Sequence, residues 1–418
     1  MNARPQLAEL TSWKDIADYL GVNVRTAQKW ETQKGLPVHR STGEKARVWA
    51  LPAELDNWKK VAAANPRCWN SLRFLRCYAM AASLIAAGAL SIIAGDYWVH
   101  HRRGPPALFK AEYSTLTVMD TRGREVWRSS FEQPFSSMAY VGDEGQQRIW
   151  FGDIDGDSGT ETLFAYYPGK VESMGASLVC FGEDGREKWR FRPKAVTDRQ
   201  QTYAPHYIIS GFDVVDLGAG RGRQIAVTSR HAVHHPNHFT LLDGRGATQS
   251  EYWHSGHLDY MNFMDVDGDG VKEVLLTGVN NGHNAATLVV LDPRDFNGAS
   301  DQGKGSPYQL QGLPLAKEKA VVLFGRTCLN RKFEIYNMGR FIRVHGGLMR
   351  LEVYERGVGD GLFVIYTLDR NLKVLKAQPT DTFRSLHRTL QGEGVLDHPL
   401  TDQEIEALAK VRILKKSW

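Results

Sequence analysis

The chain has 418 residues, a formal net charge of +5 and only four cysteines. At about 100–200 residues per domain, this length predicts two or three domains rather than one. The net charge is too small for bulk electrostatics alone to draw the protein onto nucleic acid, and four scattered cysteines exclude a disulfide scaffold or a closely spaced zinc motif.

The beginning of the chain has the pattern of a small helical domain. Ser12 followed by Asp15 has the form of a capping box, and apolar residues then recur at helical spacing. Gly21 supplies a turn, Asn23 can cap a second helix, and Gly35 can end it. The pattern therefore predicts two short helices joined by a tight turn.

The first turns of the second helix carry side chains suited to nucleic acid. Arg and Gln can read base edges, while Thr and Lys can hold phosphates. Two extended stretches then flank a polar tip at residues 41–45 and predict a hairpin with further cations, and Pro52 starts a third helix. Three tryptophans, Trp30, Trp49 and Trp58, are expected in the core of this domain. The candidate DNA-binding residues at the start of the second helix are Asn23, Arg25, Thr26, Gln28 and Lys29.

The run TSWKDIADYLGVNVRTAQKWETQKGLPVHR, followed by RVWALPAELDNWKK, resembles the winged helix-turn-helix of the MerR and excisionase group. The resemblance covers roughly the first 60 residues and places a winged helix-turn-helix domain at residues 1–65. It implies contacts to duplex DNA from the second helix and from the wing, where the candidate DNA-binding residues are Arg40, Lys45 and Arg47. The alternative is a helical domain whose basic face is solvated or binds protein.

An apolar segment divides the chain. From Phe74 to Gly95 the only strongly polar side chain is Arg76, and about 20 such residues can cross a bilayer as a helix. We therefore expect an uncleaved transmembrane helix at 74–98, with linkers at 66–73 and 99–111. The helix would anchor the protein in the inner membrane. The excess of Lys and Arg before the segment favours a cytoplasmic N-terminus and an extracytoplasmic C-terminal domain. A buried helix of a soluble domain is the alternative.

Internal repeats dominate the sequence after residue 111. A pattern of strand, tight turn and strand occurs at 116–128 and 178–190, with weaker copies at 240–244 and 288–292. Further β-rich stretches lie at 321–324, 348–354 and 362–366. We expect an all-β domain over 112–380 and a C-terminal segment, 381–418, with a helix from Thr401 to Lys416.

A second repeated element is an acidic loop. Residues 153–161 and 265–273 place carboxylates at loop positions 1, 3, 5 and 9, and with a carbonyl from position 7 these are hard oxygen ligands suited to calcium. A third copy, 216–224, lacks three of the carboxylates and is expected to hold no metal. The predicted ligands of two Ca²⁺ ions are Asp153, Asp155, Asp157, Gly159, Glu161, Asp265, Asp267, Asp269, Val271 and Glu273.

These repeats resemble the FG-GAP and VCBS repeats of integrin-like β-propellers, most clearly over residues 112–295. The resemblance implies blades that carry calcium. An EF-hand would need a glutamate at position 12 and flanking helices, and a plain Asp-Gly surface turn is the other alternative. The predicted fold class is a multidomain protein with a small α-helical winged helix-turn-helix, one transmembrane helix and an all-β propeller with calcium-binding loops.

Cysteines and histidines outside these motifs have two interpretations. Cys180 and Cys328 could form a disulfide in an oxidising compartment or be two unrelated buried thiols. His231, His234, His235 and His238 suit a metal by residue type but resemble a connecting loop in which exposed histidines need no ligand.

The motifs together predict function. No Gly-rich phosphate loop, nucleophile elbow or metalloprotease helix occurs, so we expect no enzyme. We predict a membrane-anchored, DNA-binding transcriptional regulator that forms a homodimer and contacts duplex DNA and the lipid bilayer. Its extracytoplasmic propeller would sense a protein or carbohydrate ligand. The alternative is an envelope adhesion or scaffold protein whose N-terminal domain binds protein.

Overall fold

The computed structural model divides the chain into two units, residues 1–102 and 103–418, and each is described by itself. The structure describes residues 9–41, 47–64, 88–89, 91–92, 104–136, 139–140, 147–218, 220, 222–334, 336–355 and 361–418.

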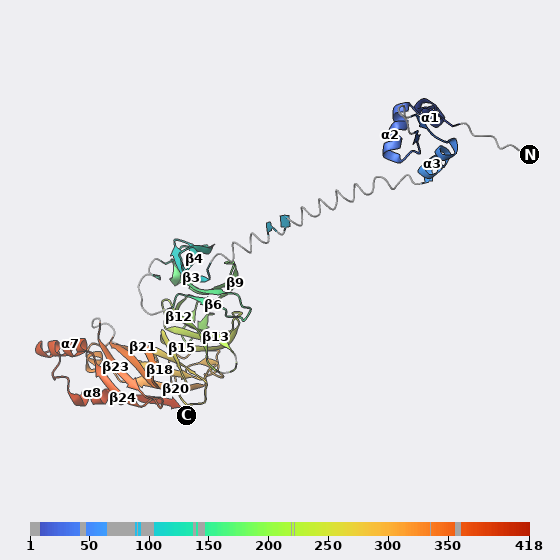
Figure 1. Cartoon of the computed structure of the whole chain (residues 1–418). Helices are drawn as coiled ribbons and strands as arrows, with labels where there is room; N and C mark the ends of the chain where they lie inside the picture. The colour runs from blue at the N-terminus through green and yellow to red at the C-terminus, as the bar shows by residue number, and fades with distance from the viewer. Residues whose placement is uncertain are drawn as a thin grey trace, which may run out of the picture. The chain divides into compact units, whose positions relative to one another are not determined.

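The first unit contains short helices and a two-stranded ribbon (Figure 1). Its described elements are α1 (Trp13–Leu20), α2 (Val24–Lys34), β1 (His39–Arg40), β2 (Val48–Trp49) and α3 (Pro52–Ala64). The side chains of Ser12 and Asn23 cap α1 and α2, and Gly21 and Gly35 end them in the left-handed conformation. These four positions confirm the local predictions, because caps depend on residues close in sequence.

The three helices share one small core. It consists of Ile16, Ala17, Leu20, Ala27, Leu36, Ala50 and Leu55. Trp30 and Trp58 pack against this core with ring centroids 5.6 Å apart, as expected, whereas Trp49 stacks on His39. This packing fixes α2 with Ala27 fully buried and leaves the opposite side of the helix exposed.

The predicted membrane topology is wrong. Among the residues that the structure describes, no helix is long and apolar enough to cross a membrane. The predicted span itself, 74–98, lies outside the described residues except at 88–89 and 91–92. The inner-membrane location and the orientation are therefore withdrawn. The fold class built on that span is wrong as well, since strands predominate over helices in the described chain.

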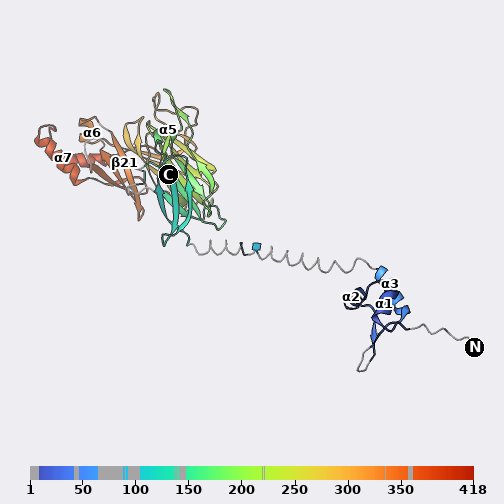
Figure 2. The same cartoon turned by 90° about the horizontal axis from the view of Figure 1, so that it is seen from above.

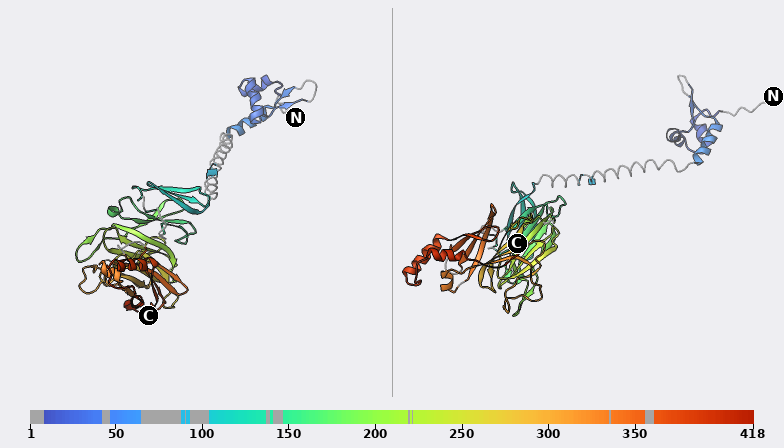
Figure 3. Two further views of the ribbon diagram at one scale, coloured as in Figure 1. Left: turned by 90° about the vertical axis from the view of Figure 1, so that its left-hand side faces the viewer. Right: turned by 90° about the horizontal axis from the view of Figure 1, so that it is seen from below.

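Within the described residues, the second unit contains five β-sheets of three to five strands and one two-stranded ribbon (Figures 1 and 3). The first sheet comprises β3 (Pro106–Glu112), β4 (Thr115–Asp120) and β5 (Glu125–Ser130), and the second comprises β6 (Ile149–Gly152), β7 (Glu161–Tyr166), β8 (Ser177–Phe181) and β9 (Glu187–Phe191). The third comprises β12 (Tyr207–Asp216), β13 (Arg223–His231), β14 (Pro236–Leu242), β15 (Thr248–Ser255) and β19 (Gly298–Ala299). The fourth comprises β16 (Tyr260–Met264), β17 (Glu273–Asn280), β18 (Ala285–Leu291), β20 (Glu318–Phe324) and β25 (Arg412–Lys416), and the fifth comprises β21 (Asn337–His345), β22 (Leu348–Glu355), β23 (Phe363–Leu368) and β24 (Val374–Pro379). All pairings in these sheets are antiparallel except that of β15 with β19.

Shorter elements connect or flank the sheets. They are α5 (Val171–Met174), the pair β10 (Val196–Thr197) and β11 (Thr202–Tyr203), α6 (Cys328–Lys332), α7 (Asp381–Gly392) and α8 (Asp402–Leu408). Figure 2 shows α6 and α7 on the side of the fifth sheet.

Each sheet packs its faces against its neighbours in the series. Leu163 and Ala165 of β7 share a core with the third sheet, while Phe164 and Tyr166 of the same strand share one with the first sheet. Side chains alternate between the two faces of a strand, so β7 is buried throughout. Because a sheet on each side covers the two faces of such an inner strand, both of its faces are apolar.

The repeated hairpins couple consecutive sheets. The predicted hairpins at 116–128 and 178–190 are confirmed as β4–β5 and β8–β9. Trp127 of the first lies against Gly185 in the turn of the second, where a Cβ would come within 2.7 Å of the indole. Trp189 meets Gly246 of the third sheet in the same way. The glycine of each turn therefore provides the space for the preceding tryptophan.

The end of the second unit differs from the prediction. A capping box at Thr401 starts α8 as expected, but the helix ends at Leu408 and does not continue to Lys416. The chain instead forms β25, which pairs with β20 as an outer strand of the fourth sheet. Cys180 and Cys328 are both free, which favours two unrelated thiols.

Candidate functional site

Both acidic loops occupy the same place in their sheets. The loop at 153–161 joins β6 to β7, and the loop at 265–273 joins β16 to β17, in each case the first two strands of a sheet. The loop at 216–224 joins β12 to β13 at the corresponding place in the third sheet. Asp216 is its only carboxylate and accepts the Gly218 amide at 2.9 Å.

The loop at 153–161 is organised by its own amides. Asp153 accepts hydrogen bonds from Gly156 and Ser158 at 2.7 and 3.1 Å. Glu161, only 1 % exposed, accepts one from the amide of Ile154 at 3.1 Å. These bonds use both oxygens of Asp153 but only Oε2 of Glu161, so Oε1 of Glu161 carries no amide hydrogen bond.

The loop at 265–273 repeats this network atom for atom. Asp265 accepts hydrogen bonds from Gly268 and Gly270 at 2.6 and 3.0 Å, and Glu273 accepts one from Val266 at 2.9 Å. Glu273 is fully buried. Such amide bonds orient carboxylates before any cation binds, which reduces the ordering cost of binding.

Most of the predicted calcium ligands come together. One oxygen from each of Asp153, Asp155, Asp157 and Glu161 lies within 4.8 Å of the others, and the same holds for Asp265, Asp267 and Asp269. At loop position 7, the amides of Gly159 and Val271 donate to the preceding aspartates at 2.7 and 2.8 Å. These donor sets consist of hard oxygens and fit calcium.

A lysine from the fourth strand reaches into the first loop. The Nζ atom of Lys188, on β9, lies 2.7 Å from Asp155, 3.0 Å from Glu161 and 3.5 Å from Asp157. The hydrogen bond to Asp155, followed by that to Glu161, raises the pKa of Lys188 well above its usual value. The side chain of Lys188 is 33 % exposed, so it can leave the loop for solvent.

Lys319 contacts the second loop in the same way. It lies on β20, which is also the fourth strand of its sheet. Its Nζ lies 2.5 Å from Asp267 and 2.6 Å from Glu273, and only 8 % of the side chain is exposed. Arg294 pairs with Asp269 at 2.7 Å. Neither lysine was predicted from the sequence, because each lies at a different distance along the chain from its loop, 33 and 52 positions after the aspartate that it contacts.

The predicted DNA-binding residues fall into two groups. Arg25, Gln28 and Lys29 are exposed on α2. Other members form hydrogen bonds or ion pairs within the domain. The Asn23 carboxamide oxygen accepts hydrogen bonds from the amide and the hydroxyl of Thr26, both at 2.8 Å. Arg40 forms an ion pair with Glu31 of α2 at 2.7 Å. Arg47 is exposed, and Lys45 lies outside the described residues.

The predicted histidine loop is partly buried. His231 ends β13 and His238 lies in β14, with 4 % and 2 % exposure, so the expectation of exposed side chains is wrong for both. His234 is exposed and lines, with His235 and His257, a groove of about 710 Å³. Aromatic rings cover both imidazoles: Tyr203 and Tyr207 lie against His231, and Phe191 and Trp253 lie against His238.

Acid should destabilise this region. Burial lowers the pKa of His231 and of His254 to about 4, below the unfolded value of about 6.5. The unfolded chain therefore binds more protons between these values, and the stability present above about pH 6.5 is lost as the pH falls toward 4. We expect the urea concentration at the midpoint of unfolding to decrease as the pH falls from about 6.5 to 4. The variant His254→Gln should show a smaller decrease of this midpoint with pH. An unchanged slope in the variant would contradict this assignment.

No protein-family model and no curated protein matches the chain. Solved structures that match include the Dos1 propeller, with 11 % identity, a TM-score of 0.31 and coverage of 66 % of this chain and 68 % of that chain. A protein of unknown function from Bacteroides caccae has 10 % identity, a TM-score of 0.25 and coverage of 67 % and 93 %. The V. cholerae biofilm matrix protein Bap1 has 13 % identity, a TM-score of 0.27 and coverage of 54 % and 38 %.

The structural neighbours thus include a propeller, but at these TM-scores they assign no family to the chain. None of the three is named as a winged helix-turn-helix protein. The predicted membership of the first unit in that family is therefore unsupported, although its individual helix caps lie where the sequence predicted them.

Proposed function

We propose that this chain is a DNA-binding regulator whose first unit contacts duplex DNA through α2 and whose second unit binds calcium in two loops. The observation that carries the first part is the exposed cluster of Arg25, Gln28 and Lys29 on a helix fixed from behind by its core.

The geometry of α2 supports this proposal. Residues three and four apart lie on one helix face, so Arg25, Gln28 and Lys29 form one continuous patch. Ala27 lies on the buried side. An α-helix fits the major groove, where Arg and Gln make bidentate contacts with base edges and Lys neutralises phosphates.

Neutralising this patch tests the proposal in the full chain. We expect Arg25→Ala with Lys29→Ala to weaken binding to duplex DNA about 30-fold or more, at about 1–3 kcal/mol for each truncated side chain. The slope of log affinity against log salt should become shallower by up to about two, one unit for each phosphate that is no longer neutralised. Fluorescence anisotropy over a salt series measures both quantities.

A matched control separates the patch from general charge. Lys14 and Lys60 are exposed on α1 and α3, so changing both to Ala removes the same charge from other faces. This control should keep most of the affinity. An equal loss of DNA affinity in both double variants would show that the binding is a nonspecific attraction of charge. Unchanged DNA binding in the α2 variant would favour the alternative, in which this face binds protein.

The calcium part of the proposal rests on the duplicated loops. Each provides four acidic side chains at the same four positions, with amides already bonded to both oxygens of the first aspartate. When bound, calcium would neutralise the remaining oxygens and tie the loop together. The ammonium groups of Lys188 and Lys319 already neutralise some of these carboxylates through ion pairs. Calcium therefore has to displace a lysine side chain from each loop.

A further inference from the structure

A sulfur and two imidazoles meet beside α6, far from the acidic loops in sequence. Cys328 begins α6, His387 lies in α7, and His398 lies in the segment before α8. One ligand atom from each of the three residues lies within 4.8 Å of the other two. Three elements that are separate in sequence therefore bring metal-ligating side chains to one place.

His387 has a buried ring nitrogen that is suited to bind a metal. Its side chain is only 1 % exposed, and within the described part of the chain its Nε2 atom has no hydrogen-bond partner. A buried polar atom without a partner costs about 1–3 kcal/mol. The ring lies against that of His398, with centroids 5.7 Å apart and planes at 70°.

His398 is oriented by carboxylates on both ring nitrogens. Its Nδ1 lies 2.7 Å from Asp397, and its Nε2 lies 3.1 Å from Oε1 of Glu404. A carboxylate that holds the far nitrogen of an imidazole is the usual support of a metal-bound histidine. Asp397 can provide that support while Nε2 faces the cluster.

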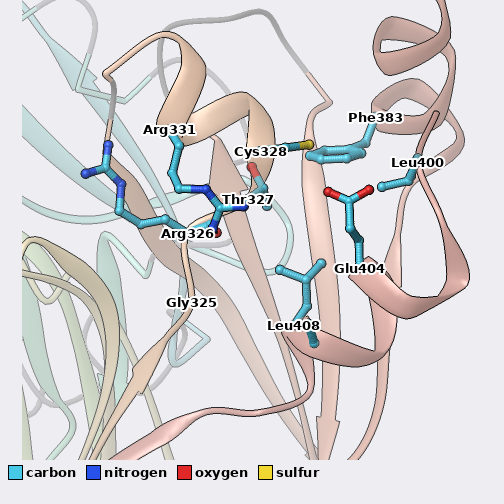
Figure 4. A pocket seen from close by; sticks show the side chains of 10 residues that line it. Gly325, Arg326, Thr327, Cys328, Arg331, Phe383, Leu400, Glu404 and Leu408 are labelled. Carbon is cyan, nitrogen blue, oxygen red and sulfur yellow. The ribbon is translucent and has the colours of Figure 1, made fainter. Parts of the chain in front are cut away.

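Glu404 has one oxygen available for the same place. Its Oε2 accepts the Thr401 amide at 3.3 Å in the capping box of α8, which leaves Oε1 directed toward His398. Glu404 and Cys328 also line one cavity of about 180 Å³. Figure 4 shows the Cys328 sulfur beside the Phe383 ring, with the Glu404 carboxylate close to that ring.

We propose that Cys328, His387 and His398 bind a transition-metal ion, best suited to Zn²⁺, with Glu404 as the fourth ligand. Sulfur and imidazole donors favour zinc over calcium or magnesium, and four ligands of this kind match its tetrahedral preference. A thiolate and a carboxylate balance the two positive charges of the ion. Zinc bonds of about 2.0–2.3 Å require the side chains to close slightly on the metal.

The site would act as a structural clamp. α6 follows β20 of the fourth sheet, whereas α7 and α8 follow β24 of the fifth sheet and lead back to β25. A single ion would join these segments around the small apolar cluster of Leu329, Leu362, Phe383 and Leu396. Zinc binding should therefore stabilise the segment that returns the chain to the fourth sheet.

Cobalt substitution in the full chain tests this proposal directly, because a thiolate bound to Co²⁺ gives an intense charge-transfer band. We expect the chelator-treated, reduced protein to bind one equivalent of Co²⁺ with this band and with the visible bands of tetrahedral cobalt. Zinc should displace the cobalt and abolish both. Calcium in excess should change neither, since the acidic loops hold no sulfur.

Variants identify the ligands. Cys328→Ser should lose the charge-transfer band, and His398→Gln should weaken cobalt binding at least tenfold. The half-exposed His398 keeps the test valid if a change at the buried His387 prevents folding. Cys180→Ala and His345→Gln remove a thiol and an imidazole elsewhere and should leave the spectrum unchanged. Absence of the band in the unmodified protein, or its persistence in Cys328→Ser, would overturn the proposal.

Discussion

Lys319→Met should lower the thermal stability of the calcium-free protein, and calcium should restore it. The substitution removes the cation next to Glu273, which is fully buried. Breaking a buried ion pair on one side costs about 3–5 kcal/mol, because the remaining charge is uncompensated. We expect the melting temperature of the second unit to fall by several degrees in the presence of a calcium chelator.

Added calcium reverses the effect because it neutralises the same carboxylates. Without the competing ammonium group, the loop at 265–273 should bind calcium at least tenfold more tightly, which corresponds to about 1.4 kcal/mol. Calorimetric titration of the full chain measures this affinity, and thermal melts with and without calcium measure the rescue.

Two further variants act as controls for this prediction. Lys188→Met should have a smaller effect, because the Lys188 side chain is 33 % exposed and water replaces part of its interaction. Asp155→Ala combined with Asp267→Ala should remove most of the stabilisation by calcium. A melting temperature of Lys319→Met that stays equal to that of the unmodified protein would show that the buried pair carries no stability. Failure of calcium to raise it would argue against the metal.

Gly278→Ala should destabilise the second unit by about 3 kcal/mol or more. A Cβ at this position would lie 1.8 Å from the carbonyl oxygen of His257. Overpacking of a well-packed interior costs about 1–3 kcal/mol and occasionally more. Because the obstacle is backbone, no side-chain rotation relieves it. The amide of Val279 also donates to this same carbonyl at 3.0 Å, so a shift of the strand breaks a hydrogen bond.

Urea unfolding of the variant measures this loss, and Gly211→Ala is the matched control. Gly211 lies within β12, where a Cβ would meet no atom within 4 Å. Its substitution should change the free energy of unfolding by less than about 1 kcal/mol. Similar losses in both variants would point to a general intolerance of side chains on glycine in these strands. A stable Gly278→Ala protein would contradict the close approach of β17 to the preceding loop.

The features that the sequence predicted well depend on neighbouring residues. Ser12 and Asn23 cap helices through amides three residues away, and the hairpins β4–β5 and β8–β9 close through short turns. The acidic loops were found for the same reason. The membrane prediction rested on apolar composition alone, and no helix among the described residues is long and apolar enough to span a bilayer.

The missed residues act across the sheets. Lys188 follows Asp155 by 33 positions, and Lys319 follows Asp267 by 52, so no local motif contains either pair. Cys328 was considered as a disulfide partner or an unrelated buried thiol but not as a metal ligand, because the spacing rules for zinc motifs require ligands close in sequence. The strand β25 was mistaken for helix because its apolar residues also fit a helical period. Its pairing with β20 depends on a partner strand that local sequence does not specify.

The return of β25 to β20 has a consequence during synthesis on the ribosome. The fifth sheet and α7 and α8 lie between these two strands in the chain, so β20 emerges long before its partner. Until β25 arrives, the edge of the fourth sheet offers unpaired amides and carbonyls to any other nascent strand. During this interval the growing polypeptide is open to misassembly through that edge.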